Sequence, residues 1–221
     1  RMEQRAEAWE PDSVVLLAYE LTQAMAAAHE KNIIHRDLKP SNIMLIPDKD
    51  RPSGERVKIL DFGIAKLSPA ATPVQASNTA KTQMKTLHGS VMGTALYMPP
   101  EQWGQAEDVD GRADVFALGV VLYDLLAGKM PYEGSSRSLL RESVTPLERA
   151  APKAPQRLAR LVNQMLEVTA AKRPTMAEVL TQLTAMRPRR LRKRDVLIGG
   201  GIGAIVVLAL VGLVGGALSR F

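Results

Sequence analysis

An uncharged run of 23 residues near the C-terminal end constrains this chain more than any other feature of its sequence. Every residue from 196 to 218 is aliphatic or glycine. A helix needs roughly 20 such residues to cross the hydrocarbon core of a bilayer. A helix buried in a protein core is the alternative, but such helices are usually shorter and carry a polar edge. The sequence therefore predicts a single transmembrane helix over residues 196–218.

Basic residues gather directly before this run. Residues 1–186 carry equal numbers of basic and acidic side chains, so the net charge of +6 comes from the last 35 residues. This distribution argues against a domain that binds nucleic acid. The basic segment 187–194 is expected to stay on the cytoplasmic side and to bind anionic lipid headgroups. The prediction is a single-pass protein of the cell membrane, with residues 1–195 in the cytoplasm and 219–221 as an extracytoplasmic stub.

Glycine pairs within the apolar run allow two interpretations. Gly199 and Gly203, and again Gly212 and Gly216, have the spacing at which two membrane helices approach closely. This favours a homodimer through the membrane helix. Glycine is also common in membrane spans that do not dimerise, so both interpretations stay open.

The rest of the sequence is typical of a mainly α-helical fold with a few short strands. Amphipathic spacing predicts helices at residues 12–30, 155–168 and 174–186, and a strongly apolar run predicts a helix at 113–127. Asp12 or Ser13 is expected to cap the first helix, Gly128 to end the second, and Pro174 to lie in the first turn of the last. Short apolar runs predict strands at 33–34, 43–46 and 57–60, and residues 68–92 read as a loop.

Three short blocks bring together the side chains that can carry chemistry. They are His-Arg-Asp-Leu-Lys-Pro-Ser-Asn at 35–42, Asp-Phe-Gly at 61–63 and Gly-Thr-Ala-Leu-Tyr-Met-Pro-Pro-Glu at 93–101. Asp37 can accept a proton from a hydroxyl nucleophile, and Lys39 places positive charge beside it. Asn42 and Asp61 offer the one or two oxygen ligands that Mg²⁺ takes from a protein when phosphate oxygens supply the rest. A turn-capping Asp–Asn pair is the alternative for Asp37 and Asn42 alone.

Together the three blocks resemble the catalytic loop, the metal-binding segment and the end of the activation segment of protein kinases. The resemblance runs from about residue 12 to residue 186. Lys39 and Thr94 are similar to the serine/threonine branch of that family. The run Ile64-Ala65-Lys66 and the predicted membrane helix resemble bacterial receptor-like kinases.

The resemblance implies a C-terminal kinase lobe that transfers the γ-phosphoryl group of ATP to Ser or Thr hydroxyls of proteins. Asp37 would be the base and Lys39 would stabilise charge and contact ATP. Asn42 and Asp61 would hold Mg²⁺ and with it the nucleotide.

Further positions match the family residue by residue. Asp114 resembles the aspartate that holds the backbone of the catalytic loop, and Glu101 and Arg173 resemble an ion pair that ties the activation segment to the lobe. Arg36 resembles the arginine that receives a phosphate on the activation segment. Four hydroxyl residues of that segment are candidate phosphorylation sites, with Thr86 and Ser90 favoured over Thr79 and Thr82. Pro99 departs from the family, which usually has alanine there.

The nucleotide-clamping half of a kinase is not recognisable in this sequence. No glycine-rich loop, strand lysine or orienting helix glutamate precedes residue 12, and the first residue is Arg1. We expect a kinase domain over 1–186 that lacks its N-terminal lobe, a basic segment over 187–195, the membrane helix and the stub. The alternative is a catalytically inactive C-lobe that serves as a membrane-tethered binding or scaffold module. A small-molecule kinase is disfavoured by the Pro-Pro-Glu block and Arg173.

Overall fold

The computed structural model describes residues 9–51, 54–62, 95–103, 109–132 and 143–187. The chain divides into two compact units, Arg1–Met186 and Arg187–Phe221, and the fold set out below is that of the first. The predicted membrane helix at 196–218 and the candidate phosphorylation sites Thr79, Thr82, Thr86 and Ser90 lie outside the described residues. Among the helices in the described ranges, none is both long enough and apolar enough to cross a membrane.

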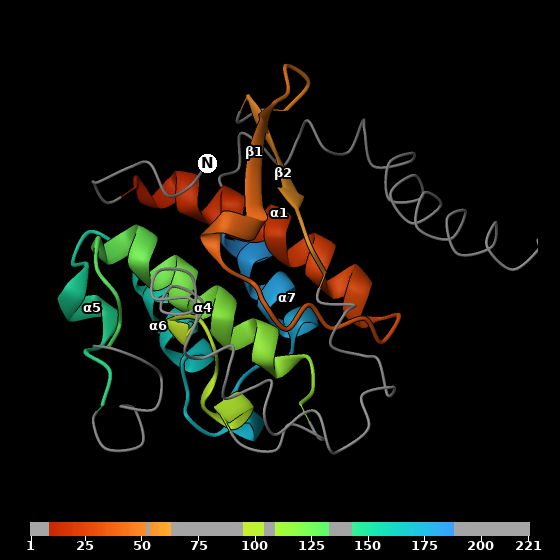
Figure 1. The fold of residues 1–221 in the computed structure, drawn as a ribbon. Coiled ribbons are helices and arrows are strands. Elements are labelled where there is room, and N and C mark those ends of the chain that lie inside the picture. The colour runs from red at the N-terminus through yellow and green to blue at the C-terminus, as the bar shows by residue number, and fades with distance from the viewer. Residues whose placement is uncertain (1–8, 52–53, 63–94, 104–108, 133–142, 188–221) are drawn as a thin grey trace, which may run out of the picture. The chain divides into compact units, whose positions relative to one another are not determined.

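Two long helices, α1 (Pro11–His29) and α4 (Arg112–Ala127), form the centre of this unit (Figure 1). Helix α1 buries one face at helical spacing, as predicted. Helix α4 is buried on nearly all sides, which is expected of a helix that is hydrophobic all round. It ends at Gly128, whose φ of 66° gives the left-handed cap that the sequence predicts.

The predicted cap of α1 is wrong. The helix begins one residue earlier, after Glu10, and no side chain caps it. Pro11 occupies its first turn, where the missing N–H costs nothing and the fixed φ already suits a helix. This places Asp12 and Ser13 inside the helix rather than at its cap.

Three further α-helices have their bounds within the described residues, and the ends of the last two differ from the prediction. They are α5 (Leu147–Ala150), α6 (Gln156–Met165) and α7 (Met176–Met186). Pro174 precedes α7 instead of lying in its first turn. The start of α7 is a capping box, in which the Thr175 N–H and hydroxyl both donate to Glu178 Oε2, at 2.7 and 2.9 Å. The short helix α5 was not predicted from the sequence.

Strands β1 (Ile43–Pro47) and β2 (Glu55–Ile59) form an antiparallel hairpin in which Ile43 pairs with Ile59. The predicted strand at 33–34 is wrong. Asn32 takes a left-handed φ of 58°, and the Ile33 N–H donates to the Ala28 carbonyl at 3.0 Å. These contacts form a Schellman turn at the end of α1. Ile33 and Ile34 therefore follow the helix cap and do not form a strand.

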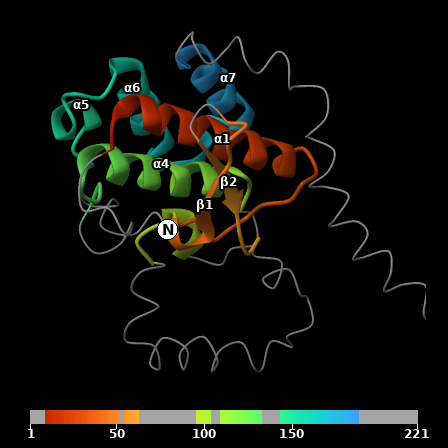
Figure 2. The same cartoon turned by 90° about the horizontal axis from the view of Figure 1, so that it is seen from above.

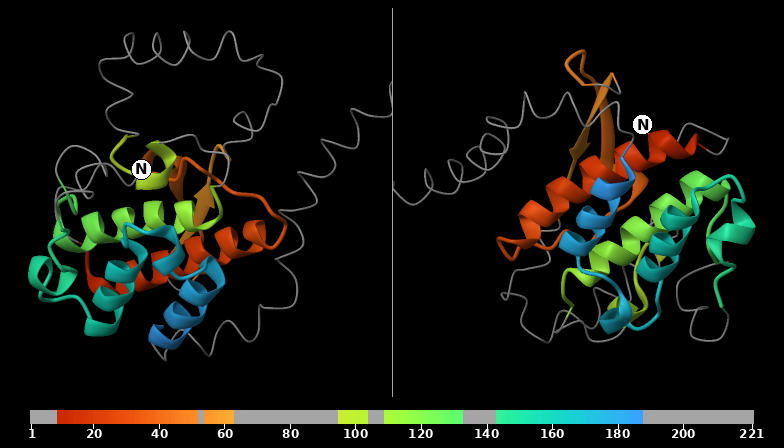
Figure 3. Two further views of the ribbon diagram at one scale, coloured as in Figure 1. Left: turned by 90° about the horizontal axis from the view of Figure 1, so that it is seen from below. Right: turned by 180° about the vertical axis from the view of Figure 1, so that it is seen from behind.

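The elements lie on two sides of the α1–α4 pair. Helix α7 packs on α1, α6 packs on α4, and α6 and α7 contact each other, whereas β2 packs on α1. Views from above, below and behind place α5, α6 and α7 on one side of the pair (Figures 2 and 3). The hairpin and the short helix η4 (Pro100–Trp103) lie on the other side.

Candidate active site

The backbone of residues 35–37 is held by one buried carboxylate. Asp114, in the first turn of α4, is 1% exposed. Its Oδ2 accepts the His35 N–H and its Oδ1 accepts the Arg36 N–H, both at 2.8 Å. Arg36 has a left-handed φ of 63°, a conformation that costs a non-glycine residue energy. The two hydrogen bonds offset that cost and set the direction in which the next residue, Asp37, leaves the loop.

A histidine that sequence reasoning missed completes this arrangement. His29 Nε2, in the last turn of α1, lies 2.8 Å from Asp114 Oδ2. Gly111 makes room for the ring, since a Cβ at that position would lie 2.6 Å from His29 Nδ1. No sequence motif links His29 to Asp114, which lies 85 residues away.

His35 connects the catalytic loop to the segment that carries Asp61. It is fully buried; its Nε2 lies 2.9 Å from the Leu60 carbonyl oxygen and its Nδ1 lies 3.3 Å from the Asp37 N–H. These partners assign the neutral tautomer in which Nε2 donates and Nδ1 accepts. The ring also lies 4.8 Å from that of Phe62, centroid to centroid. Asp37 and Asp61 are therefore positioned from the same imidazole.

Asp37, Lys39 and Asn42 come together as the sequence predicts from their spacing. Lys39 Nζ lies 3.0 Å from Asp37 Oδ2, and the two side chains remain 21% and 25% exposed. Asn42 Nδ2 donates to the Asp37 carbonyl at 2.8 Å and more weakly to Asp37 Oδ2 at 3.4 Å. The carboxylate of Asp37 is thus fixed in direction and still reachable by a hydroxyl from outside.

The donor set fits the Mg²⁺ that the resemblance implies. Both donor contacts of the Asn42 amide go to Asp37, which leaves Oδ1 as an oxygen without a partner in the described part of the chain. The Asp61 carboxylate is exposed and likewise forms no hydrogen bond or ion pair with described residues. The Leu60 N–H donates to the Asn42 carbonyl at 2.8 Å, so the backbones beside both oxygens are tied together. Within the described residues no cluster of three His, Asp or Glu exists, as expected for Mg²⁺ rather than for a caged metal.

Arg36 and the residues before η4 line a small hollow beside Asp37. Its walls include Arg36, Asp37, Tyr97, Met98 and Gln102. The Arg36 Nε is buried and has no hydrogen-bond partner among the described residues. The wall opposite the loop is fixed by Tyr132, whose hydroxyl donates to the Leu96 carbonyl. Burial, with the nearby Tyr97, raises the pKa of Tyr132, so this hydroxyl stays protonated and keeps donating.

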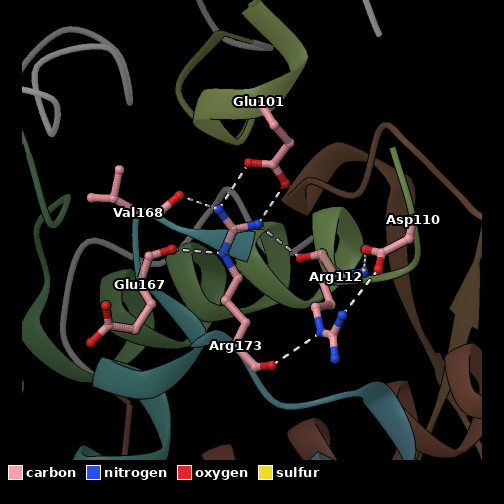
Figure 4. Close-up of polar contacts among 6 residues, drawn as sticks. All are labelled: Glu101, Asp110, Arg112, Glu167, Val168 and Arg173. Atoms are coloured by element: carbon pink, nitrogen blue, oxygen red, sulfur yellow. Dashed lines mark hydrogen bonds and ion pairs between the residues drawn. The ribbon is translucent and has the colours of Figure 1, made fainter. Parts of the chain in front are cut away.

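The ion pair expected between Glu101 and Arg173 is present (Figure 4). Arg173 Nη1 and Nη2 donate to the two carboxylate oxygens of Glu101 at 2.6 and 2.9 Å. The same guanidinium also donates to the carbonyls of Glu167, Val168 and Arg112. Arg173 is 2% exposed and lies over the Phe116 ring at 4.8 Å. Its donors therefore join η4, the start of α4 and the connection after α6.

Residues 1–183 match the family model described as the protein kinase domain. The chain belongs to this family. The protein kinase domain accounts for the catalytic loop, the Asp-Phe-Gly segment and the Glu101–Arg173 pair as parts of one unit.

Curated relatives of this kinase domain come from several bacteria. The chain is 37% identical to the serine/threonine-protein kinase pkn2 of Myxococcus xanthus over 182 residues, which are 79% of the chain and 20% of pkn2. It is 36% identical to pkn3 of the same organism over 187 residues, 81% of the chain and 32% of pkn3. It is 36% identical to PknA of Mycobacterium tuberculosis over 154 residues, 70% of the chain and 31% of PknA. The chain thus matches only about a fifth to a third of the length of these relatives.

Proposed function

We propose that this protein is a serine/threonine protein kinase, which transfers the γ-phosphoryl group of ATP to Ser or Thr hydroxyls of protein substrates. The observation that carries the proposal is the Asn42 amide. Its two contacts to Asp37 direct the base and at the same time leave Oδ1 available, while the Leu60 N–H that donates to the Asn42 carbonyl ties in the segment that carries Asp61. An Asp–Asn pair that only capped a turn would have no need of a second carboxylate, Asp61, which has no partner among the described residues.

Each residue then has one task in the transfer. Asp37 accepts the proton of the attacking hydroxyl, and its exposed carboxylate is reachable from outside. Lys39 keeps an ammonium group next to that carboxylate, where negative charge of the transferring group gathers. Asn42 Oδ1 and Asp61 would hold Mg²⁺, which when bound neutralises phosphate charge. His35 and Asp114 position the loop.

The test is an Asp37→Asn substitution with Asp50→Asn as its matched control. Asp50 is an exposed carboxylate in the turn of the hairpin, away from the proposed base. Phosphoryl transfer from radiolabelled Mg·ATP to casein and to the protein itself is measured for the full chain. Because residues 1–11 of the given sequence contain no glycine, a chimera with the N-terminal lobe of pkn3 ahead of Arg1 is assayed in parallel.

We expect transfer by the chimera to fall at least 100-fold in Asp37→Asn and to be unchanged in Asp50→Asn. A chimera that binds Mg·ATP yet transfers no phosphate contradicts the proposal and favours the scaffold module instead. So does transfer that is insensitive to Asp37→Asn. The full chain without the added lobe is expected to bind ATP weakly and to transfer little.

We propose further that residues 196–218 anchor the protein in the cell membrane, with the kinase domain over 1–186 in the cytoplasm. The support is the sequence: an uncharged run long enough to span, preceded by the basic segment 187–194. The basic segment would bind anionic headgroups, and Gly199–Gly203 or Gly212–Gly216 would allow a homodimer. Flotation of the full chain with liposomes after carbonate washing tests the anchor, and a chain that stays at the bottom of the gradient contradicts it.

A phosphate on Thr86 or Ser90 is proposed to order the activation segment through Arg36. The buried Nε of Arg36, which lacks a partner among the described residues, supports this role. Phosphopeptide mapping of active protein tests it. Active protein with Thr79, Thr82, Thr86 and Ser90 all unmodified would contradict the proposal.

A further inference from the structure

The outward face of α6 and the connection before it carry basic side chains that no residue in the described part of the chain compensates. Arg157 and Arg160 are exposed and three residues apart, so they are neighbours on the helix surface. Lys153 precedes the helix and Arg149 lies on α5, and both are exposed. The inward face of α6 is buried, because Leu158, Leu161, Val162 and Met165 pack into the core. We call the four cations together the α6 basic face.

Among the described residues, no carboxylate pairs with a cation of this face. Residues 143–169 are all described, and they contain two acidic side chains against the four basic ones. Glu148 accepts from Asn163 Nδ2 at 2.7 Å, an amide that also orients the cap of α5. Glu167 lies beyond the end of α6. None of the four cations forms an ion pair or side-chain hydrogen bond within the described residues. Like charges at helical spacing repel each other, so an external anion at this face would stabilise it.

The position of the face matters as much as its charge. Helices α5, α6 and α7 lie on the side of the α1–α4 pair that is opposite the hairpin and η4 (Figures 2 and 3). Asp37 belongs to the catalytic loop, and the hollow beside it is lined by that loop, by residues in and before η4, and by the first turns of α4. The α6 basic face therefore lies on the side away from the proposed phosphoryl-transfer site.

The last described helix, α7, also lies on this side of the α1–α4 pair (Figures 2 and 3). Helix α7, which packs against α6, ends at Met186, and the uncharged run begins ten residues later. Ten residues reach at most about 35 Å when fully extended. An anchored lobe is thus held next to the bilayer at a high local concentration, where even weak attraction of surface cations takes effect.

We propose that the α6 basic face docks the kinase lobe on the anionic headgroups of the membrane to which the chain is anchored. The proposal rests on the proposed anchoring by residues 196–218. Docking through this face turns the catalytic loop away from the bilayer and toward proteins in the aqueous phase. Each Lys or Arg near an anionic leaflet is worth roughly a fivefold change in the docked population at low salt.

The experiment uses the full chain, which contains no cysteine, in nanodiscs. A single fluorophore is attached at Gln164→Cys, at the exposed end of the face, or at Asp50→Cys in the hairpin turn. Quenching by a headgroup-labelled lipid is compared in discs of phosphatidylcholine alone and with 30% phosphatidylglycerol. The test variant is Lys153→Gln/Arg157→Gln/Arg160→Gln. Its matched control is Lys31→Gln/Lys49→Gln/Lys129→Gln, which removes three exposed cations elsewhere.

We expect quenching at position 164 but not at position 50, only in the anionic discs. It should fall in high salt and fall at least tenfold in the test variant, while the control variant behaves like the parent. If the chain does not float with liposomes, the proposed anchoring by residues 196–218 is wrong, and this outcome is distinguished from a failure of the α6 basic face to dock. A chain that floats, but whose quenching ignores phosphatidylglycerol and the three substitutions, overturns the docking proposal. If the fluorescence at position 164 responds to soluble poly-glutamate and not to phosphatidylglycerol, the α6 basic face binds an acidic protein instead. This outcome also overturns the docking proposal.

Discussion

Asp114 and Arg173 are both buried charges that hold backbone groups, yet they are compensated in opposite ways. Arg173 donates to the Glu101 carboxylate and to three carbonyl oxygens, so its charge has an ionised partner and its fork is fully used. Asp114 accepts two neutral N–H groups, and its remaining contact is to His29, which is charged only when protonated. Arg173 thus forms an ion pair to which backbone carbonyl groups add, whereas the charge of Asp114 is stabilised mainly by backbone N–H groups.

Because of this difference, Arg173 contributes mainly to the stability of the lobe, and Asp114 mainly to the position of the catalytic loop. The Arg173 donors reach residues that are far apart in sequence, so their loss would release several elements at once. The Asp114 contacts converge on two adjacent residues of the catalytic loop, so their loss would be felt mainly there. We therefore expect substitutions at Arg173 to unfold the lobe more easily and substitutions at Asp114 to loosen the loop.

The largest effect is expected from Arg173→Met. The substitution leaves Glu101 without its cation and three carbonyls without donors, which should lower the free energy of unfolding by about 3–5 kcal/mol. Chemical denaturation of the full chain measures it. Lys172→Met, an exposed neighbour, is the control and should change stability by less than about 0.5 kcal/mol. Equal effects of the two substitutions would contradict a stabilising role of the Arg173 hydrogen bonds.

A smaller and more local effect is expected from Asp114→Asn. The amide keeps one acceptor but turns a donor toward backbone N–H groups, at a cost of about 2 kcal/mol. Hydrogen exchange should speed up most at the amides of His35 and Arg36, because those are the donors to Asp114. Asp110→Asn, at an exposed carboxylate, is the control. Loss of protection spread evenly over all helices would contradict a role limited to the loop.

Gly111→Ala tests whether the contact of His29 with Asp114 contributes to the stability of the protein. The added Cβ would lie 2.6 Å from His29 Nδ1 and should push the ring away, lowering stability by about 1 kcal/mol. Combined with His29→Ala, the substitution should cost less than the sum of the two single changes, because both remove the same contact. Additive costs in this double-mutant cycle would show that Gly111 and His29 act independently.

The smallest effect concerns the capping box of α7. The Thr175 backbone N–H, and next its hydroxyl, lower the pKa of Glu178. A lowered carboxyl pKa adds stability above the unfolded-state pKa, and that stability is lost as the pH falls through the folded-state pKa. In Thr175→Ala the pKa of Glu178 should rise but stay below its ordinary value, because the backbone donor remains. A carbon-detected NMR titration measures this, with Thr181→Ala as the control hydroxyl.

Much of the helical framework could be predicted from the pattern of apolar residues alone. Helices α1, α4, α6 and α7 lie within a few residues of the predicted ranges, because α1, α6 and α7 have a buried face of regular spacing and α4 is apolar on nearly all sides. The failures are at ends and short elements. Pro11 displaced the expected cap, and Asn32 closed a turn where a strand was predicted. The start of helix α5 is capped by Asn163, which lies on α6. The sequence around α5 gives no sign of this cap, because the capping residue is 16 positions away.

The candidate site shows the same division. The spacing of Asp37, Lys39 and Asn42 on one short loop brings them together whatever the rest of the chain does. The motifs also name Asp61, Asp114, Glu101 and Arg173, through a resemblance and not through geometry. The carbonyls that Arg173 binds, and the contact of His29 with Asp114, have no motif at all.

The sequence by itself determined the family, the local catalytic loop, the buried helix faces and the uncharged run of 23 residues. These depend on residues close together in the chain, where spacing decides geometry. Only the tertiary structure decided which distant groups compensate the buried charges, and that Arg157 and Arg160 lie exposed on α6 without an ion-pair partner among the described residues. The contacts of the buried charges join residues from 61 to 85 positions apart, and hydrogen bonds over that separation leave no periodic trace in a sequence.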